Sequence, residues 1–183
     1  MGTAIENVDD PHPSADEVVI RVGYCGICGS DLHMTQEASC GVTAGTVLGH
    51  EFSGEIVELG GNVAGAKFGD LVAVAPVRGC GRCADCLKGE PAWCSQMLLQ
   101  GGDYADYAIP KSWQCLQLPG TTSLQDGALV EPLAVALHAI RQAQLVPGAL
   151  ALVMGAHRRL YSNASASRAF WLRRFTTWLR VAA

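Results

Sequence analysis

Hydrophobic and polar residues alternate along the first part of the chain, with the period of two that is typical of half-buried β-strands. The clearest case is residues 16–25, where Val18, Ile20, Val22 and Tyr24 share one face. Further strands, each bounded by glycine or proline, are predicted at residues 51–60, 70–77, 103–110 and 115–119. Many short strands with glycine-rich connections predict a β-barrel or sandwich-like domain.

The pattern changes after residue 121. Residues 122–145 carry Leu133, Leu137 and Ile140 at helical spacing and predict two helices, with Pro132 in the first turn of the second. Residues 148–156 are typical of a buried parallel strand that opens an α/β unit. We therefore predict a β-rich domain at 1–121, a helical connection with the first strand of an incomplete α/β domain at 122–156, and an irregular or disordered basic tail at 157–183.

Composition and charge limit the function classes. Hydrophobic residues make up 49% of the 183 residues, so a core can form, and the net charge is −4. The tail holds six arginines and no acidic residue, which leaves a strongly acidic body that disfavours nucleic-acid binding. No secretory signal or bilayer-spanning stretch is visible, so we expect a cytoplasmic protein without membrane contact. Residues 170–180 could form a basic amphipathic helix on a membrane, but a frame-shifted or mis-spliced end is the favoured interpretation.

One short stretch, residues 79–94, reads "GCGRCADCLKGEPAWC" and has the spacing C-x2-C-x2-C-x7-C. In a chain without a secretory signal, clustered cysteines are typical of metal ligands rather than disulfides. An iron–sulfur cluster shares the first part of this spacing but needs an earlier fourth cysteine followed by proline, whereas Ser95 follows here. The lobe at 79–95 is therefore predicted to hold a closed structural zinc ion. Its four thiolate ligands are Cys80, Cys83, Cys86 and Cys94.

A second group of metal-ligand types is divided between "GYCGICGSDLH" (23–33) and "GHEFSGEI" (49–56). Cys28, His50 and Glu51 offer one thiolate, one imidazole and one carboxylate. With water or substrate in the remaining position, this set is typical of a catalytic zinc site. A single histidine or cysteine is more often structural, so the prediction depends on the combination.

These two motifs, together with "LVEPLAVALHAI" (129–140), resemble the zinc-dependent medium-chain alcohol dehydrogenases from about residue 5 to Gly155. The sequence is most similar to the branch of sorbitol, butanediol and threonine dehydrogenases. The resemblance implies a mainly β fold with some α: a GroES-like β-barrel catalytic domain with a cysteine lobe, followed by a Rossmann domain. It also implies two zinc ions per chain, NAD or NADP as hydride acceptor, and oxidation of a secondary alcohol or polyol to a ketone. A homo-oligomer formed through the Rossmann domain is a further implication.

The resemblance also implies roles for individual residues. The catalytic zinc ligands would be Cys28, His50, Glu51 and Glu131, the last either binding zinc or holding its water. Asp31 would hydrogen-bond His50 and fix its tautomer. Ser30 and His33 would carry the substrate proton to solvent. From the residues alone, Ser30 and Asp31 could instead cap a helix that begins near Leu32, and His33 could be an ordinary surface histidine.

The sequence departs from this family after Gly155, because no glycine follows it. The glycine-rich loop that binds a dinucleotide pyrophosphate is absent, so no cofactor-binding residue is assigned and we expect this chain to be inactive by itself. The alternative is a non-catalytic zinc-binding module, or a decoy subunit that pairs with full-length relatives. The remaining cysteines, Cys25, Cys40 and Cys115, are expected to pack as small apolar groups.

Overall fold

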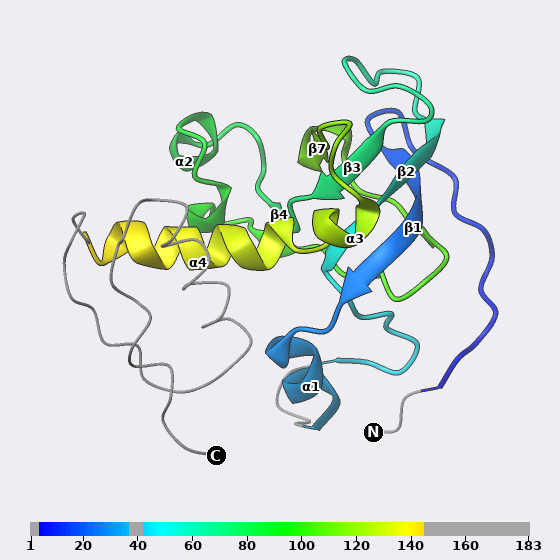
Figure 1. Cartoon of the computed structure of the whole chain (residues 1–183), viewed down its shortest axis with the longest axis horizontal. Coiled ribbons are helices and arrows are strands. Elements are labelled where there is room, and N and C mark those ends of the chain that lie inside the picture. Colours follow the sequence, from blue (N-terminus) through cyan, green and yellow to red (C-terminus); the bar gives the residue numbers. More distant parts are fainter. Residues whose placement is uncertain (1–3, 37–41, 145–183) are drawn as a thin grey trace. The chain divides into compact units, whose positions relative to one another are not determined.

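The computed structural model describes residues 4–36 and 42–144 (Figure 1). These residues belong to two compact units, Met1–Leu129 and Val130–Ala183. The predicted strand at 148–156, the basic tail and Cys40 lie outside the described residues.

The first unit is built on a five-stranded antiparallel sheet with the strand order β6-β1-β2-β3-β7. A separate two-stranded sheet pairs β4 with β5. The strands are β1 (Val18–Gly26), β2 (Glu51–Leu59), β3 (Leu71–Val74), β4 (Val77–Arg78), β5 (Leu98–Leu99), β6 (Tyr107–Ala108) and β7 (Cys115–Gln117).

The hydrophobic core lies where the central strands meet. Its buried residues are Val18, Ile20, Phe52, Ile56, Val72, Val74 and Ala108. Cys25 and Cys115 pack against this core, as predicted. Tyr24 does not: it is 51% exposed, because β1 has a register irregularity between Val22 and Tyr24 that interrupts the alternation of faces. Tyr24 therefore lies outside the core, although it shares the alternating pattern of Val18, Ile20 and Val22.

Two of the predicted strands are shorter in the structure. The strand predicted at 70–77 is interrupted by Ala75 and Pro76, and proline cannot donate a backbone hydrogen bond to a sheet. The strand predicted at 103–110 contains only the two residues of β6. Its first residues, Asp103 and Tyr104, instead form a connection whose backbone N–H groups both donate to the Leu48 carbonyl.

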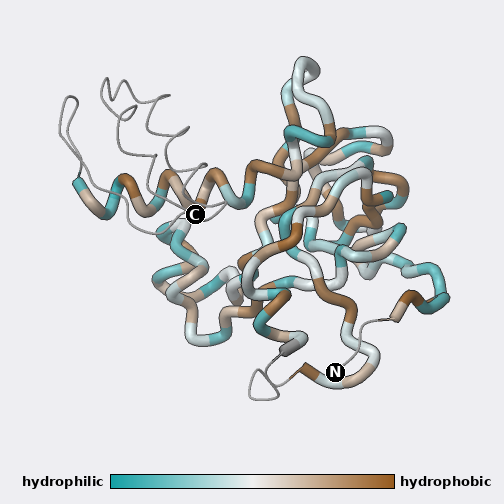
Figure 2. The backbone as a smooth tube through the Cα atoms, turned by 60° about the horizontal axis from the view of Figure 1, so that its bottom comes forward, coloured by the Kyte–Doolittle hydropathy of each residue, from teal (hydrophilic) through white to brown (hydrophobic). Residues whose placement is uncertain are grey.

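The described residues form four α-helices and two 3-10 turns. They are α1 (Gly29–Gln36), α2 (Ala84–Leu87), α3 (Leu124–Gly127) and α4 (Val130–Gln142), with 3-10 turns at Pro91–Trp93 and Ser112–Gln114. The two helices predicted within 122–145 correspond to α3 and α4, and Pro132 lies in the first turn of α4. Hydrophobic and hydrophilic segments alternate along α4, as expected of an amphipathic helix (Figure 2).

The short helix α3 packs against the main sheet. The Ser123 hydroxyl caps it by accepting a 3.1 Å hydrogen bond from the Asp126 N–H. The Ser53 hydroxyl of β2 donates to the Leu124 carbonyl. A Cβ at Gly127 would lie 2.6 Å from Leu118 Cδ1 and 2.9 Å from Ser53 Cβ, so neighbouring atoms would have to shift to admit a larger residue. Close packing of this helix therefore depends on a residue without a side chain.

Candidate metal centres

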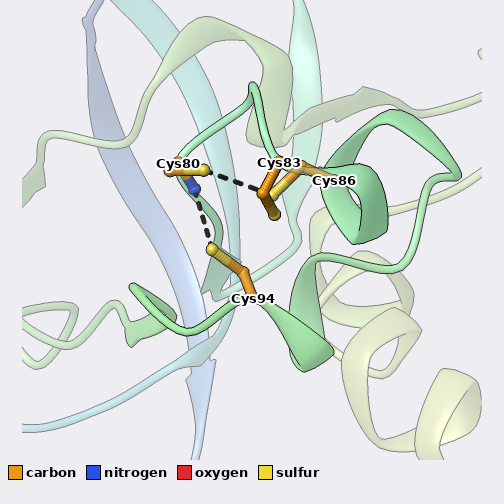
Figure 3. Close-up of side chains that lie close together, drawn as sticks. All are labelled: Cys80, Cys83, Cys86 and Cys94. Atoms are coloured by element: carbon orange, nitrogen blue, oxygen red, sulfur yellow. Dashed lines mark hydrogen bonds between the residues drawn. The ribbon is translucent and has the colours of Figure 1, made fainter.

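The four-cysteine lobe brings its sulfur atoms together as predicted (Figure 3). All four sulfurs lie within 4.8 Å of one another, and Cys80 Sγ is 4.0 Å from Cys86 Sγ. Zinc–sulfur bonds of about 2.3 Å in a tetrahedron place sulfurs about 3.8 Å apart, so the observed spacing fits a zinc ion. The described cysteines are all free thiols. This group could therefore hold zinc without any disulfide to break.

Tight turns of the backbone produce this arrangement. Gly81 and Gly89 adopt positive φ angles of +74° and +81°, which favour glycine. Gly79 lies so close to the sulfurs that a Cβ there would be 2.4 Å from Cys86 Sγ. The Cys94 sulfur accepts hydrogen bonds from two backbone N–H groups, those of Cys80 at 3.4 Å and Gln96 at 3.3 Å. The lobe is thus a local structure in which backbone turns present the ligands.

The thiols of the lobe differ in acidity because their surroundings differ. Backbone N–H groups of Arg82 and Cys83 lower the pKa of Cys80 to about 6, since they stabilise the thiolate. Burial raises the pKa of Cys86 to about 11. Only Cys94 is buried, and the other three cysteines are partly exposed. The lobe therefore holds its ligands near the surface, where one thiolate is already favoured at neutral pH.

The second group is created by the register of the main sheet. In the antiparallel pairing of β1 with β2, Gly26 at the end of β1 lies opposite Glu51 at the start of β2. Cys28 follows β1, and His50 immediately precedes β2. Ligand atoms of Cys28, His50 and Glu51 accordingly lie within 4.8 Å of one another. All three residues are buried, with exposed fractions of 1%, 5% and 0%. One thiolate, one imidazole and one carboxylate at this spacing could hold zinc and leave a position open.

Asp31 holds this group together from the first turn of α1, the helix into which β1 leads (Figure 1). Its Oδ1 lies 3.4 Å from His50 Nδ1, and its Oδ2 accepts a 2.8 Å hydrogen bond from the Cys28 N–H. The contact to Nδ1 leaves His50 Nε2 as the nitrogen for a metal. The Ser30 hydroxyl lies 3.5 Å from Nε2. Both side chains therefore lie close to His50, and their roles stay predictions.

Helix α1 begins at Gly29 rather than near Leu32, and the Asp31 carboxylate also caps it by accepting a hydrogen bond from the N–H of Cys28, the residue just before the helix. Ser30 and Asp31 lie inside its first turn. His33 is exposed on the same helix, three residues after Ser30, and residues at this spacing share a helix face. Glu131 lies in the first turn of α4, in the second unit. The roles of His33 in proton transfer and of Glu131 as a ligand stay predictions.

Sequence reasoning missed two residues near this group, Asp103 and Tyr104. The Tyr104 hydroxyl lies 2.8 Å from Asp31 Oδ2. Asp103 is 1% exposed, and neither of its carboxyl oxygens has a hydrogen-bond partner among the described residues. Burial, and secondarily the charge of Asp31, raises the pKa of Asp103 to about 8. The pair Gly101–Gly102, with Gly102 at a φ of +109°, was the available sign that the chain turns here rather than entering a strand.

Comparison with known proteins relates this chain to the alcohol dehydrogenases. Residues 14–120 match the family model described as the alcohol dehydrogenase GroES-like domain. The chain is 41% identical over 161 residues to a probable D-xylulose reductase A of Neosartorya fischeri, covering 83% of this chain and 44% of that protein. Among the described helices, none is long and apolar enough to cross a bilayer.

Solved structures show the same relationship. Galactitol-1-phosphate dehydrogenase from Escherichia coli superposes with a TM-score of 0.82 at 31% identity, over 90% of this chain and 49% of that one. For 2R,3R-butanediol dehydrogenase from Bacillus subtilis the TM-score is 0.77 at 34% identity, over 91% and 51% of the two chains. The chain thus spans about half the length of the relatives it matches. It belongs to the zinc-dependent medium-chain alcohol dehydrogenases, in their sorbitol dehydrogenase-like branch, and carries the mainly β GroES-like domain of that family.

Proposed function

We propose that this chain supplies the catalytic domain of a zinc- and NAD(P)-dependent polyol dehydrogenase, which oxidises a secondary alcohol to a ketone. The observation that carries the proposal is the buried set of Cys28, His50 and Glu51, whose ligand atoms lie within 4.8 Å of one another. The names of the relatives support the substrate class, because a xylulose, a galactitol phosphate and a butanediol all carry oxygen on neighbouring carbons.

The residues of the buried set would together coordinate one metal ion. Cys28, His50 and Glu51 would provide three ligands, and a substrate oxygen or water would provide a further one. A bound zinc ion supplies Lewis-acid polarisation of an alcohol or carbonyl oxygen. Asp31 Oδ1, 3.4 Å from His50 Nδ1, would attract the proton to Nδ1, which would keep the lone pair of Nε2 available and make the imidazole a stronger ligand.

A path for the substrate proton begins at Ser30. Its hydroxyl lies beside the ring nitrogen that would bind the metal, and it can both accept and donate a proton. His33 is exposed on the same helix face, where an imidazole can exchange a proton with solvent. We therefore assign Ser30 to receive the alcohol proton and His33 to release it to water.

The four-cysteine lobe has a different task. Four thiolates around one ion leave no position for a substrate, so this site would serve structure alone. Residues 156–183 contain no glycine and thus no glycine-rich loop for a dinucleotide. We expect residues 1–183 to bind about two zinc ions, as the two ligand groups suggest, but to show no turnover without a dinucleotide-binding domain.

A chimera tests this proposal. Residues 1–144 are joined to the dinucleotide-binding part of the D-xylulose reductase relative, and NAD-dependent oxidation of xylitol, sorbitol and butanediol is measured. We expect turnover of at least one polyol, and its loss in the matched variant Cys28→Ser. A chimera that is folded, holds about two zinc ions and binds NAD, yet oxidises none of them, would contradict the proposal and favour the non-catalytic zinc-binding module. Activity of residues 1–183 alone would contradict the expected need for the second domain.

A further inference from the structure

The Asp31 carboxylate is surrounded by four hydrogen-bond donors, which is the number that its two oxygens can accept. Its Oδ2 lies 2.8 Å from both the Cys28 N–H nitrogen and the Tyr104 hydroxyl. Its Oδ1 lies 3.4 Å from both the Gly49 N–H nitrogen and His50 Nδ1. Two of the donors belong to the backbone and one belongs to the histidine that Asp31 orients. Tyr104 therefore supplies the only other side-chain contact to Asp31 among the hydrogen bonds of the described residues.

Tyr104 is itself held in place by neighbouring segments. Its N–H donates a 2.9 Å hydrogen bond to the Leu48 carbonyl, two residues before His50. Its ring lies against Gly49, where a Cβ would be 2.8 Å from Tyr104 Cδ1 and 2.9 Å from Tyr104 N. Gly49 has a φ of +95°, so glycine suits this position for two reasons. The aromatic ring is thus fixed against the segment that carries the histidine.

The hydroxyl of Tyr104 has one proton and two acceptors within reach. The Gly26 carbonyl lies 3.0 Å away, and Asp31 Oδ2 is nearer at 2.8 Å. Hydrogen bonds to a charged acceptor are the stronger ones, so Asp31 is the preferred partner. Burial, followed by the hydrogen bond to Asp31, holds the pKa of Tyr104 well above its usual range. The hydroxyl therefore stays protonated and acts as a donor.

The set of Cys28, His50 and Glu51 is called the mixed site, because its ligands are of three kinds. We propose that Tyr104 is a positioning residue for the mixed site, acting through Asp31 on His50. The terminal torsion of an aspartate is soft, and the Gly49 N–H contact to Oδ1 is long, at 3.4 Å. The two short contacts, from the Cys28 N–H and the Tyr104 hydroxyl to Oδ2, therefore do most to fix the carboxylate plane and to keep Oδ1 directed at His50 Nδ1. The imidazole ring then presents Nε2 to a metal ion in a single orientation. This inference rests on the proposed function, because it concerns the same histidine.

The substitution Tyr104→Phe tests the inference, since it removes the hydroxyl and keeps the ring that packs against Gly49. The affinity of each site for Co²⁺ is measured in residues 1–183 by competition with a chelator, and the ligand-field spectra distinguish the four-sulfur site from the mixed site. We expect the mixed site to lose about threefold to tenfold in affinity, below the roughly 10- to 100-fold typical of direct partners of a ligand. The four-cysteine site is the internal control, and its affinity should not change.

A matched control is Tyr107→Phe, which removes the hydroxyl of a half-buried tyrosine on β6 and should alter neither affinity. Nitrogen-detected NMR of His50 adds a readout that general destabilisation would not give, because Tyr104→Phe should increase the minor tautomer in the metal-free chain. An unchanged mixed-site affinity in Tyr104→Phe would overturn this inference alone. An equal loss at both sites would also overturn it, as a general effect on folding. Absence of metal from the mixed site of the unaltered chain would overturn the proposed function, and this inference with it.

Discussion

The two candidate metal centres collect their ligands in opposite ways. The four-cysteine lobe draws all of its ligands from residues 80–94 and presents them by backbone turns close to the surface. The mixed site joins Cys28 to His50 and Glu51 across the end of a long antiparallel pairing, and all three residues are buried. The first site is thus local, and we expect it to become ordered only with its ion, whereas the second is formed by the pairing of the sheet itself.

This difference suggests separate physical roles. A small lobe with few buried hydrophobic residues gains its folding free energy from the metal, because a preformed site rarely exists in the unfolded chain. A site built on the strands of a packed sheet can hold its ligands rigidly and still leave a coordination position open. The mixed site would therefore serve chemistry, and the lobe would serve stability.

The largest expected effects come from removing one ligand at each site. Cys86→Ser should release the ion of the lobe and increase amide hydrogen exchange across residues 79–97 by at least about 100-fold, because metal binding there is coupled to folding. Cys28→Ser should release the other ion and leave exchange in the lobe unchanged. Metal analysis and hydrogen-exchange mass spectrometry measure both results. Slow exchange in a metal-free lobe would show that it folds without its ion.

Substitution of one glycine beside each metal centre tests whether the two centres are independent, and it leaves every ligand in place. Gly79→Ala would push a methyl group against Cys86 Sγ, and Gly49→Ala would push one against Tyr104 at a positive φ. Each should cost about 1–3 kcal/mol and weaken metal binding at its own site only. Gly61→Ala is the control, because nothing lies within 4 Å of its added Cβ and its φ is not positive. If either alanine weakened both sites equally, the two centres would not be independent.

A smaller effect is expected from the buried carboxyl group of Asp103. Its pKa is raised to about 8 by burial and by Asp31, so the folded protein keeps a proton that the unfolded chain releases above about pH 4. This contribution to stability is complete below about pH 4 and is lost as the pH rises through 8. In Asp103→Asn, the free energy of unfolding of the metal-free protein should therefore fall less between pH 5 and 8, by at least about 1.4 kcal/mol. Urea denaturation at the two pH values measures this, and parallel pH profiles of the two proteins would contradict it.

The smallest effect lies outside both ligand sets, at Glu17. Hydrogen bonds from Ser14, with a further contribution from Lys111, lower the pKa of Glu17 to about 2. A lowered pKa contributes stability above about pH 4.3, which is lost as the pH falls through 2. Because Ser14 is exposed to solvent, Ser14→Ala should cost less than about 1 kcal/mol at pH 7 and still less at pH 2, with both metal affinities unchanged. Thermal unfolding at both pH values is the check, and an altered metal affinity would show unexpected coupling.

The ligands of both centres could be predicted from the sequence because their residue types and spacings are chemically distinctive. Cys80 to Cys94 lie so close in the chain that any turn-rich backbone brings them together. The strands β1 and β2 were also predictable, the first from the alternation of Val18, Ile20 and Val22 and the second from a hydrophobic run bounded by glycine. The pairing of Gly26 with Glu51 was not, since register is determined by the core and appears only in the folded sheet.

The surroundings of the mixed site could not be predicted for the same reason. Asp103 and Tyr104 lie more than 70 residues from Asp31, and alternation suggested a strand where the chain in fact forms a connection. The sequence did not predict the short strands β4 and β5, because a strand of two residues is too short to show an alternation of hydrophobic and polar positions. A contact between two single side chains that are far apart in the chain produces no repeating pattern in the sequence from which it could be predicted.

The central claim is that one chain holds one sulfur-only ion and one ion with mixed ligands. Zinc X-ray absorption on residues 1–183, with the metal content quantified, tests it most directly. The account predicts about two zinc ions per chain, with on average about 2.5 sulfur ligands for each ion and nitrogen or oxygen for the rest, as the two ligand sets require. A single zinc ion per chain with only sulfur in its shell would contradict it.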